Sequence, residues 1–102
     1  VTDHRINLNL YKLDAIVFPT VPKVAIESNP DSSSLANFGL YIQNTDPGSN
    51  AGIPGLSIPA GLTASGLPVG LEIDGPLGSD DRLIGIGLST EAALGTVAAP
   101  PL

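Results

Sequence analysis

Two extended runs interrupted by proline and glycine constrain the fold of this chain most. They read LSIPAGL at residues 56–62 and PVGLEIDG at residues 68–75, and a short connection that contains a glycine joins them. This pattern is typical of a β-hairpin. Because proline lacks the N–H that a central strand needs, we expect Pro59 and Pro68 to lie at a strand end, a bulge or an unpaired edge.

Four consecutive apolar residues, Ala15 to Phe18, form another candidate strand. Asp14 precedes them and Pro19 follows them. A short continuous apolar run of this kind is typical of a strand that is buried on both faces, as in a parallel sheet. Such a strand requires a covering layer on each side.

The clearest helix is predicted at residues 80–94. Ser79 or Asp80 is its expected cap, the acidic side chains of its first turn complement the helix dipole, and Gly95 ends it. Its expected apolar face, at helical spacing, consists of Ile84, Leu88 and Ala92, with Leu83 and Leu94 nearby. Residues 96–102 are expected to form a flexible tail.

The rest of the chain predicts a loop and shorter helical segments. Residues 20–34 are rich in proline and serine, which is typical of a loop. The helical segments are the end of a helix through Ile6, Leu10 and Leu13, a helix or irregular apolar segment at residues 35–45 capped by Ser34, and a short helix that Asp46 caps, Pro47 opens and Gly52 ends.

Glycines inside these elements indicate close packing. Gly61 and Gly70 lie within the extended runs and leave room for another backbone or a bulky group. Gly85 and Gly87 lie inside the predicted helix, where each costs roughly 1 kcal/mol relative to alanine.

Composition excludes several classes of protein. The chain has 102 residues, the size of one domain, and 42% of them are hydrophobic, which argues against disorder. A net charge of -6, four scattered basic residues and few aromatics exclude a nucleic-acid partner. The absence of cysteine fits a cytoplasmic protein, and no signal peptide or transmembrane segment is expected. Because the chain starts with Val1, we expect it to begin inside a longer polypeptide.

The helices predicted from this sequence are too few to cover both faces of the predicted strands. A doubly buried strand and a hairpin need two helical layers, whereas the sequence predicts one clear helix and shorter ones. We therefore expect an α/β fold whose covering layers are incomplete in this chain, as in a fragment of a larger protein.

Three stretches of the sequence together resemble the carboxy-terminal portion of the amidase signature family, the hydrolases of carboxylic amides. They are DAIVFPT, TDPGSNAGIPGLSIPAGLTASGLPVGLEIDGP and GSDDRLIGIGLSTEAALG. The similarity covers about residues 11–95 and is specific, because its glycines and prolines follow a long fixed order. It is greatest toward amide hydrolases of the mandelamide and indoleacetamide type.

The resemblance implies that residues 1–102 are the carboxy-terminal fragment of a single amidase domain with a mixed α/β/α fold. It implies hydrolysis of an amide to acid and ammonia by a serine, a second serine with a cis peptide, and a lysine. No catalytic residue is assigned here, because the family's serine-rich motif lies upstream and neither Lys12 nor Lys23 stands in the lysine context. The implied partners are the remainder of the amidase chain and a small-molecule amide, and a homodimer is left open.

Other candidate sites in the sequence have simpler explanations. A triad built on His4 is rejected, since a lone histidine there is more often a surface residue. No metal or cofactor site is predicted, because the loop at residues 74–81 breaks the calcium-binding pattern and GIGLST lacks the third glycine of a dinucleotide loop. Cap and turn roles are expected instead for Glu72, Asp74, Asp80 and Asp81.

The resemblance leaves one stretch as a candidate substrate site. It borders the acyl pocket in similar amidases and consists of Tyr41, Ile42, Gln43, Asn44 and Thr45. An apolar wall with a few amide groups suits a small aromatic amide such as mandelamide. Capping by Thr45 and Asp46 and burial of Ile42 in the core are the structural alternatives. The alternative for the whole chain is an independent binding or scaffold domain that pairs through its edge strands.

Overall fold

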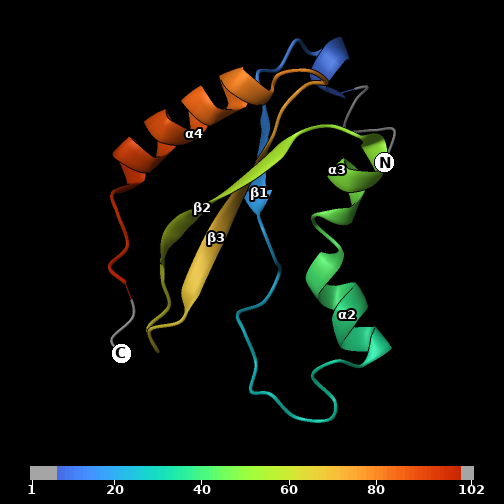
Figure 1. The fold of residues 1–102 in the computed structure, drawn as a ribbon, viewed down its shortest axis with the longest axis vertical. Coiled ribbons are helices and arrows are strands. Elements are labelled where there is room, and N and C mark those ends of the chain that lie inside the picture. The colour runs from blue at the N-terminus through green and yellow to red at the C-terminus, as the bar shows by residue number, and fades with distance from the viewer. Residues whose placement is uncertain (1–6, 100–102) are drawn as a thin grey trace.

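A computed structural model describes residues 7–99 of the chain as one three-stranded sheet with helices on both sides (Figure 1). The elements in chain order are β1 (Ile16–Pro19), α2 (Leu35–Ile42), α3 (Asp46–Ala51), β2 (Gly55–Leu62), β3 (Pro68–Asp74) and α4 (Asp80–Leu94). This arrangement agrees with the predicted α/β class.

The sheet has the order β1-β3-β2, and both pairings are antiparallel. The predicted hairpin is therefore confirmed as β2 and β3. The expectation of a parallel-type, doubly buried β1 is wrong for this chain, because Val17 is 55% exposed. An apolar run does not specify the direction of its neighbour. Moreover α4 packs chiefly on β2 and leaves the Val17 side of β1 uncovered.

Both strand prolines lie where a missing N–H is tolerated. Pro68 is the first residue of β3, and Pro59 lies on the edge strand β2 at an irregularity of register between Pro59 and Gly61. Gly61 has φ +148°, and a Cβ built on it meets no atom of the described residues within 4 Å. Its role is therefore to allow the bulge, and the expected close approach is wrong at this position.

Helix α4 begins and ends as predicted but buries a different face. Ser79 is the N-cap position and Gly95 the C-cap position. Leu83 and Gly87 are buried, whereas the predicted face is exposed: Ile84, Leu88 and Ala92. Helix α4 carries two apolar stripes. The stripe with Gly87 lies against the sheet, because the missing side chain leaves room for the side chain of Leu56.

The two short helices follow their local sequence signals. Ser34 caps α2, and its Oγ accepts a hydrogen bond of 3.2 Å from the N–H of Asn37. Gly52 ends α3 in the left-handed region with φ +71°. The N-cap of α3 is Thr45, so Asp46 is the first helical residue and not the cap.

The ends of the chain are described only in part. Residues 7–10 are helical, in line with the predicted helix end, whereas Ile6 and His4 lie outside the described residues. The segment 20–34 contains no helix or strand, as expected for a loop. Residues 96–99 have no regular secondary structure, and the flexibility of the tail stays a prediction.

Two small clusters form the core. One contains Leu8, Ala51 and Ile53, and the other joins Ile58 and Ile73 of the sheet to Leu83 of α4. Many large apolar side chains remain exposed among the described residues, including Phe38, Leu35, Leu88 and Leu77. The covering layers are thus incomplete, as the sequence predicts. No helix within residues 7–99 is long and apolar enough to cross a membrane.

Candidate functional site

The predicted substrate segment 41–45 comprises the last two residues of α2 and the turn that leads to α3, and three of its side chains are engaged in structural hydrogen bonds. Tyr41 Oη donates to the carbonyl oxygen of Val24 at 2.8 Å, and Thr45 Oγ1 donates to that of Ile42 at 3.2 Å. Asn44 Nδ2 donates to the carbonyl oxygen of Pro19 at 2.9 Å. The bonds of Asn44 and Tyr41 tie the segment to β1 and to the loop that follows it, whereas the bond of Thr45 lies within the segment.

A depression of about 260 Å³ lies beside this segment. Its lining consists of Phe18, Gln43, Asn44 and Pro47. The structure therefore brings Gln43 and Asn44 together at one surface with an aromatic ring. Tyr41, Ile42 and Thr45 do not line this depression.

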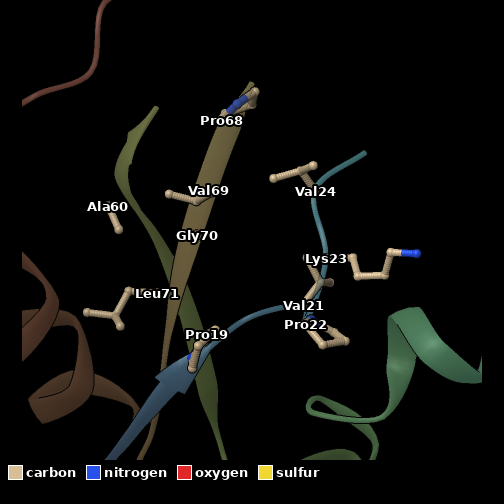
Figure 2. Close-up of a pocket in the computed structure, with 10 residues that line it drawn as sticks. All are labelled: Pro19, Val21, Pro22, Lys23, Val24, Ala60, Pro68, Val69, Gly70 and Leu71. Atoms are coloured by element: carbon tan, nitrogen blue, oxygen red, sulfur yellow. The ribbon is translucent and has the colours of Figure 1, made fainter. Parts of the chain in front are cut away.

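A larger apolar pocket of about 370 Å³ lies between the loop after β1 and the hairpin (Figure 2). Val21 and Val24 of the loop line one side of it, and Val69 and Leu71 of β3 line the other, with their side chains pointing away from the loop. The amino group of Lys23 extends away from β3. Because Tyr41 holds the carbonyl of Val24, the candidate segment also supports one wall of this pocket. Sequence reasoning missed this pocket, and the valines between the loop prolines were the available signal.

Two hydroxyl groups lie on the sheet face that carries Phe18. Thr20 Oγ1 and Ser57 Oγ are 2.6 Å apart, and the N–H of Thr20 donates to the carbonyl oxygen of Gly70 at 3.1 Å. A Cβ atom added at Gly70 would lie 2.9 Å from each hydroxyl oxygen. The expected close approach at Gly70 is therefore confirmed.

Two carboxyl groups, those of Glu72 and Asp74, lie on the same face, and the cap and turn roles expected for them are wrong. Glu72 and Asp74 belong to strand β3, so they have no cap or turn role, whereas Asp80 and Asp81 do begin α4. Asp74 is only 1% exposed. Burial, a side-chain hydrogen bond to Asp74 and the charge of Asp74 raise the pKa of Glu72 to about 7. Acidic residues two apart in a strand were the signal, since such residues share a face.

The described residues offer no evident place for a metal ion. Within residues 7–99, no group of three or more His, Cys, Asp or Glu side chains is arranged to hold one. What the face offers is amide, hydroxyl and carboxyl groups beside apolar depressions, an arrangement that can bind a small uncharged molecule.

Comparison with known proteins identifies the family to which this chain is similar. The sequence model of the family described as Amidase matches residues 1–84. The chain is 52% identical over 97 residues to an indoleacetamide hydrolase of Agrobacterium vitis, which covers 89% of this chain and 21% of that protein. It is 54% identical over 86 residues to a mandelamide hydrolase of Pseudomonas putida, which covers 83% of this chain and 17% of that protein.

A solved structure supports the same relationship. One of the subunits of glutamyl-tRNA(Gln) amidotransferase from Thermotoga maritima matches with a TM-score of 0.64 and 32% identity, over 76% of this chain and 17% of that chain. The chain thus spans about a fifth of the length of the relatives that it matches. By its sequence and by its α/β fold, this chain belongs to the amidase family.

Proposed function

We propose that residues 1–102 are the carboxy-terminal part of a longer amidase, which hydrolyses a carboxylic amide to the acid and ammonia. The observation that carries this proposal is that the chain shares more than half of its aligned residues with each of two amide hydrolases, over most of its length. The exposed apolar side chains support it, because a longer polypeptide would cover them.

In this proposal the chain supplies structure and a substrate wall, and the catalytic groups lie elsewhere in the polypeptide. The serine, the second serine with its cis peptide and the lysine expected for the reaction are assigned to the rest of the protein. Strands β1 and β2 both lie at open edges of the described sheet, where further strands of the same sheet would continue. The scaffold alternative would use these same edges, but the similarity to amidases favours the enzyme.

The proposed substrate is a small aromatic amide such as mandelamide. The two relatives named above are hydrolases of indoleacetamide and of mandelamide, and both of these amides carry an aromatic ring. The depression beside Gln43 and Asn44 supports this class, since it combines side-chain amides with the ring of Phe18.

Within the segment 41–45 the proposed roles differ. Gln43 and Asn44 contact the substrate, because both line the depression. Tyr41, Ile42 and Thr45 shape the site, since Tyr41 holds the loop after β1 and Thr45 holds the turn at Ile42. The proposed partner is the remaining polypeptide, the proposed compartment is the cytoplasm, and a homodimer is compatible with these roles.

A segment replacement tests the proposed function. Residues 11–95 would replace the matching segment of the Pseudomonas putida mandelamide hydrolase. We expect the chimera to release ammonia from mandelamide, because 54% identity preserves the strand register and the wall of the site. A matched chimera with Gly87→Leu, which blocks the packing of α4 on β2, serves as the inactive control. A folded chimera that binds mandelamide but releases no ammonia would contradict the proposal.

A further inference from the structure

Glu72 and Asp74 form a carboxyl pair on the face of the sheet opposite α4. They lie two residues apart in β3, so their side chains point to the same side. A side-chain hydrogen bond joins them. A Cβ atom added at Gly55 would lie 2.6 Å from Asp74 Oδ1 and 2.7 Å from Glu72 Oε1. Both carboxyl groups therefore meet above Gly55 of the neighbouring strand.

The same pair contacts helix α3. A Cβ atom added at Gly48 would lie 2.5 Å from Asp74 Oδ2, so the backbone of α3 lies directly against this carboxyl group. Gly48 is buried and Asp74 is 1% exposed. Because α3 follows Asn44 and Thr45 without a break, the position of α3 sets the position of the candidate segment.

The pair is also connected to the candidate depression through Phe18. Glu72 is opposite Phe18 in the register of β1 and β3, so their side chains share a face. Phe18 lines the depression together with Gln43 and Asn44. The carboxyl pair is therefore connected to the site in two ways, because Glu72 is the cross-strand neighbour of Phe18 and Asp74 lies against Gly48 of α3.

We propose that Glu72 and Asp74 hold one proton between them and that this pair fixes α3 against the sheet, which positions Gln43 and Asn44 for the substrate. The proposal rests on the proposed function of the segment 41–45. Glu72 and Asp74 are positioning residues, because they act through α3 and Phe18.

The chemistry of the pair requires the shared proton. An ionised carboxylate only accepts hydrogen bonds, so two carboxyl groups bond to each other only when one is protonated. Loss of that proton would leave two like charges in contact beside buried backbone. Among residues 7–99, those that lie opposite the pair or against it on β1, β2 and α3 carry no titratable side chain: Ile16, Phe18, Gly55, Ser57 and Gly48.

Amide hydrogen exchange in the full-length amidase tests the pair directly. The N–H groups of Ser49 and Ile53 donate within and just after α3, to the carbonyl oxygens of Thr45 and Gly48. After correction for intrinsic exchange, we expect their protection to fall about tenfold between about pH 6 and about pH 8, as the shared proton is lost. In Glu72→Gln the amide donates in place of the protonated carboxyl, so protection should stay constant with pH.

Activity measurements test the positioning role in the same enzyme. Glu72→Ala should raise KM for mandelamide about threefold to tenfold with little change in kcat, because a hydrogen bond that orders the wall is lost. Glu72→Gln should restore KM and remove its rise above neutral pH. Glu91→Gln on α4 is the matched control and should change neither quantity.

The outcomes separate this inference from the proposed function. A Glu72→Gln enzyme whose α3 exchange keeps the pH dependence of the wild type would overturn the shared proton. If the Glu72 variants change the amide exchange of α3 as expected but leave KM for mandelamide unchanged, the positioning role fails. If Asn44→Ala also leaves KM unchanged, the proposed substrate wall fails with it, while the proton-sharing pair stands.

Discussion

Thr20 and Ser57 hydrogen-bond to each other at 2.6 Å across strand β3, and they meet above Gly70. One residue follows β1 and the other belongs to β2, so the bond connects the two outer strands over the central one. The missing side chain of Gly70 makes this contact possible. It is a tertiary link on the same face as the carboxyl pair.

Substitution of Gly70 should break this link. In Gly70→Ala the new methyl group would lie 2.9 Å from both hydroxyl oxygens, so both must shift. We expect the enzyme to lose about 1 to 3 kcal/mol of unfolding free energy, the usual cost of overpacking. Urea denaturation measures it. The double variant Gly70→Ala, Ser57→Ala should recover part of the loss, and failure to recover any would contradict this explanation.

The two glycines of α4 should respond in opposite directions. Gly87→Ala places a methyl group against Leu56 and should destabilise the protein, whereas a Cβ at Gly85 meets nothing within 4 Å among the described residues. Gly85→Ala should therefore stabilise the helix by up to about 1 kcal/mol. Thermal unfolding of the two variants is the measurement. Equal effects would show that α4 does not pack as described.

Stability should depend on pH through Glu72. Its pKa is about 7 in the folded protein against an ordinary value of 4.5, so the folded state retains a proton that the unfolded state releases between these values. The contribution of this group is complete below pH 4.5 and is lost as pH rises through about 7. The wild type should therefore lose stability relative to Glu72→Gln across this window. Urea midpoints of both proteins that run parallel with pH would refute this.

Asn44 should contribute to substrate affinity. Its side chain lines the depression and is held by the carbonyl oxygen of Pro19. Asn44→Ala should raise KM for mandelamide about threefold to tenfold, because the loss of one ordinary hydrogen bond weakens binding by about that factor. Asn50→Ala is the matched control, because Asn50 Nδ2 also donates to a backbone carbonyl oxygen, that of Asp46, but Asn50 does not line the depression. Steady-state kinetics measure KM for both variants. Similar KM values would contradict a role of Asn44 in the substrate wall.

Leu88 should matter more than its exposure suggests. It is 65% exposed in the described part of the chain and lies on the apolar stripe of α4 that faces away from the sheet. If a longer polypeptide covers this stripe, Leu88→Ala should cost about 2 kcal/mol or more in the full-length protein. The neighbouring exposed residue gives the control, since Ser89→Ala should be close to neutral. A neutral Leu88→Ala would mean that this stripe stays in water.

Local backbone chemistry determined much of this protein from the sequence alone. The prolines of the hairpin, the cap at Ser34 and the glycines that end α3 and α4 act on their own neighbours along the chain, so the sequence predicts them correctly. The fixed order of glycines and prolines also carries the resemblance to amidases, and several of these glycines, such as Gly52 and Gly61, have φ values that other residues rarely adopt.

Tertiary structure alone decided which surfaces meet. Helix α4 offers two apolar stripes, and only the fit of Leu56 against Gly87 selects one of them. In the same way, β1 runs antiparallel to its neighbour β3, and the apolar run of β1 does not specify that neighbour or its direction. The carboxyl pair depends on Gly48 and Gly55, which come from other elements. Packing and pKa values depend on neighbours in space, and sequence spacing does not specify those neighbours.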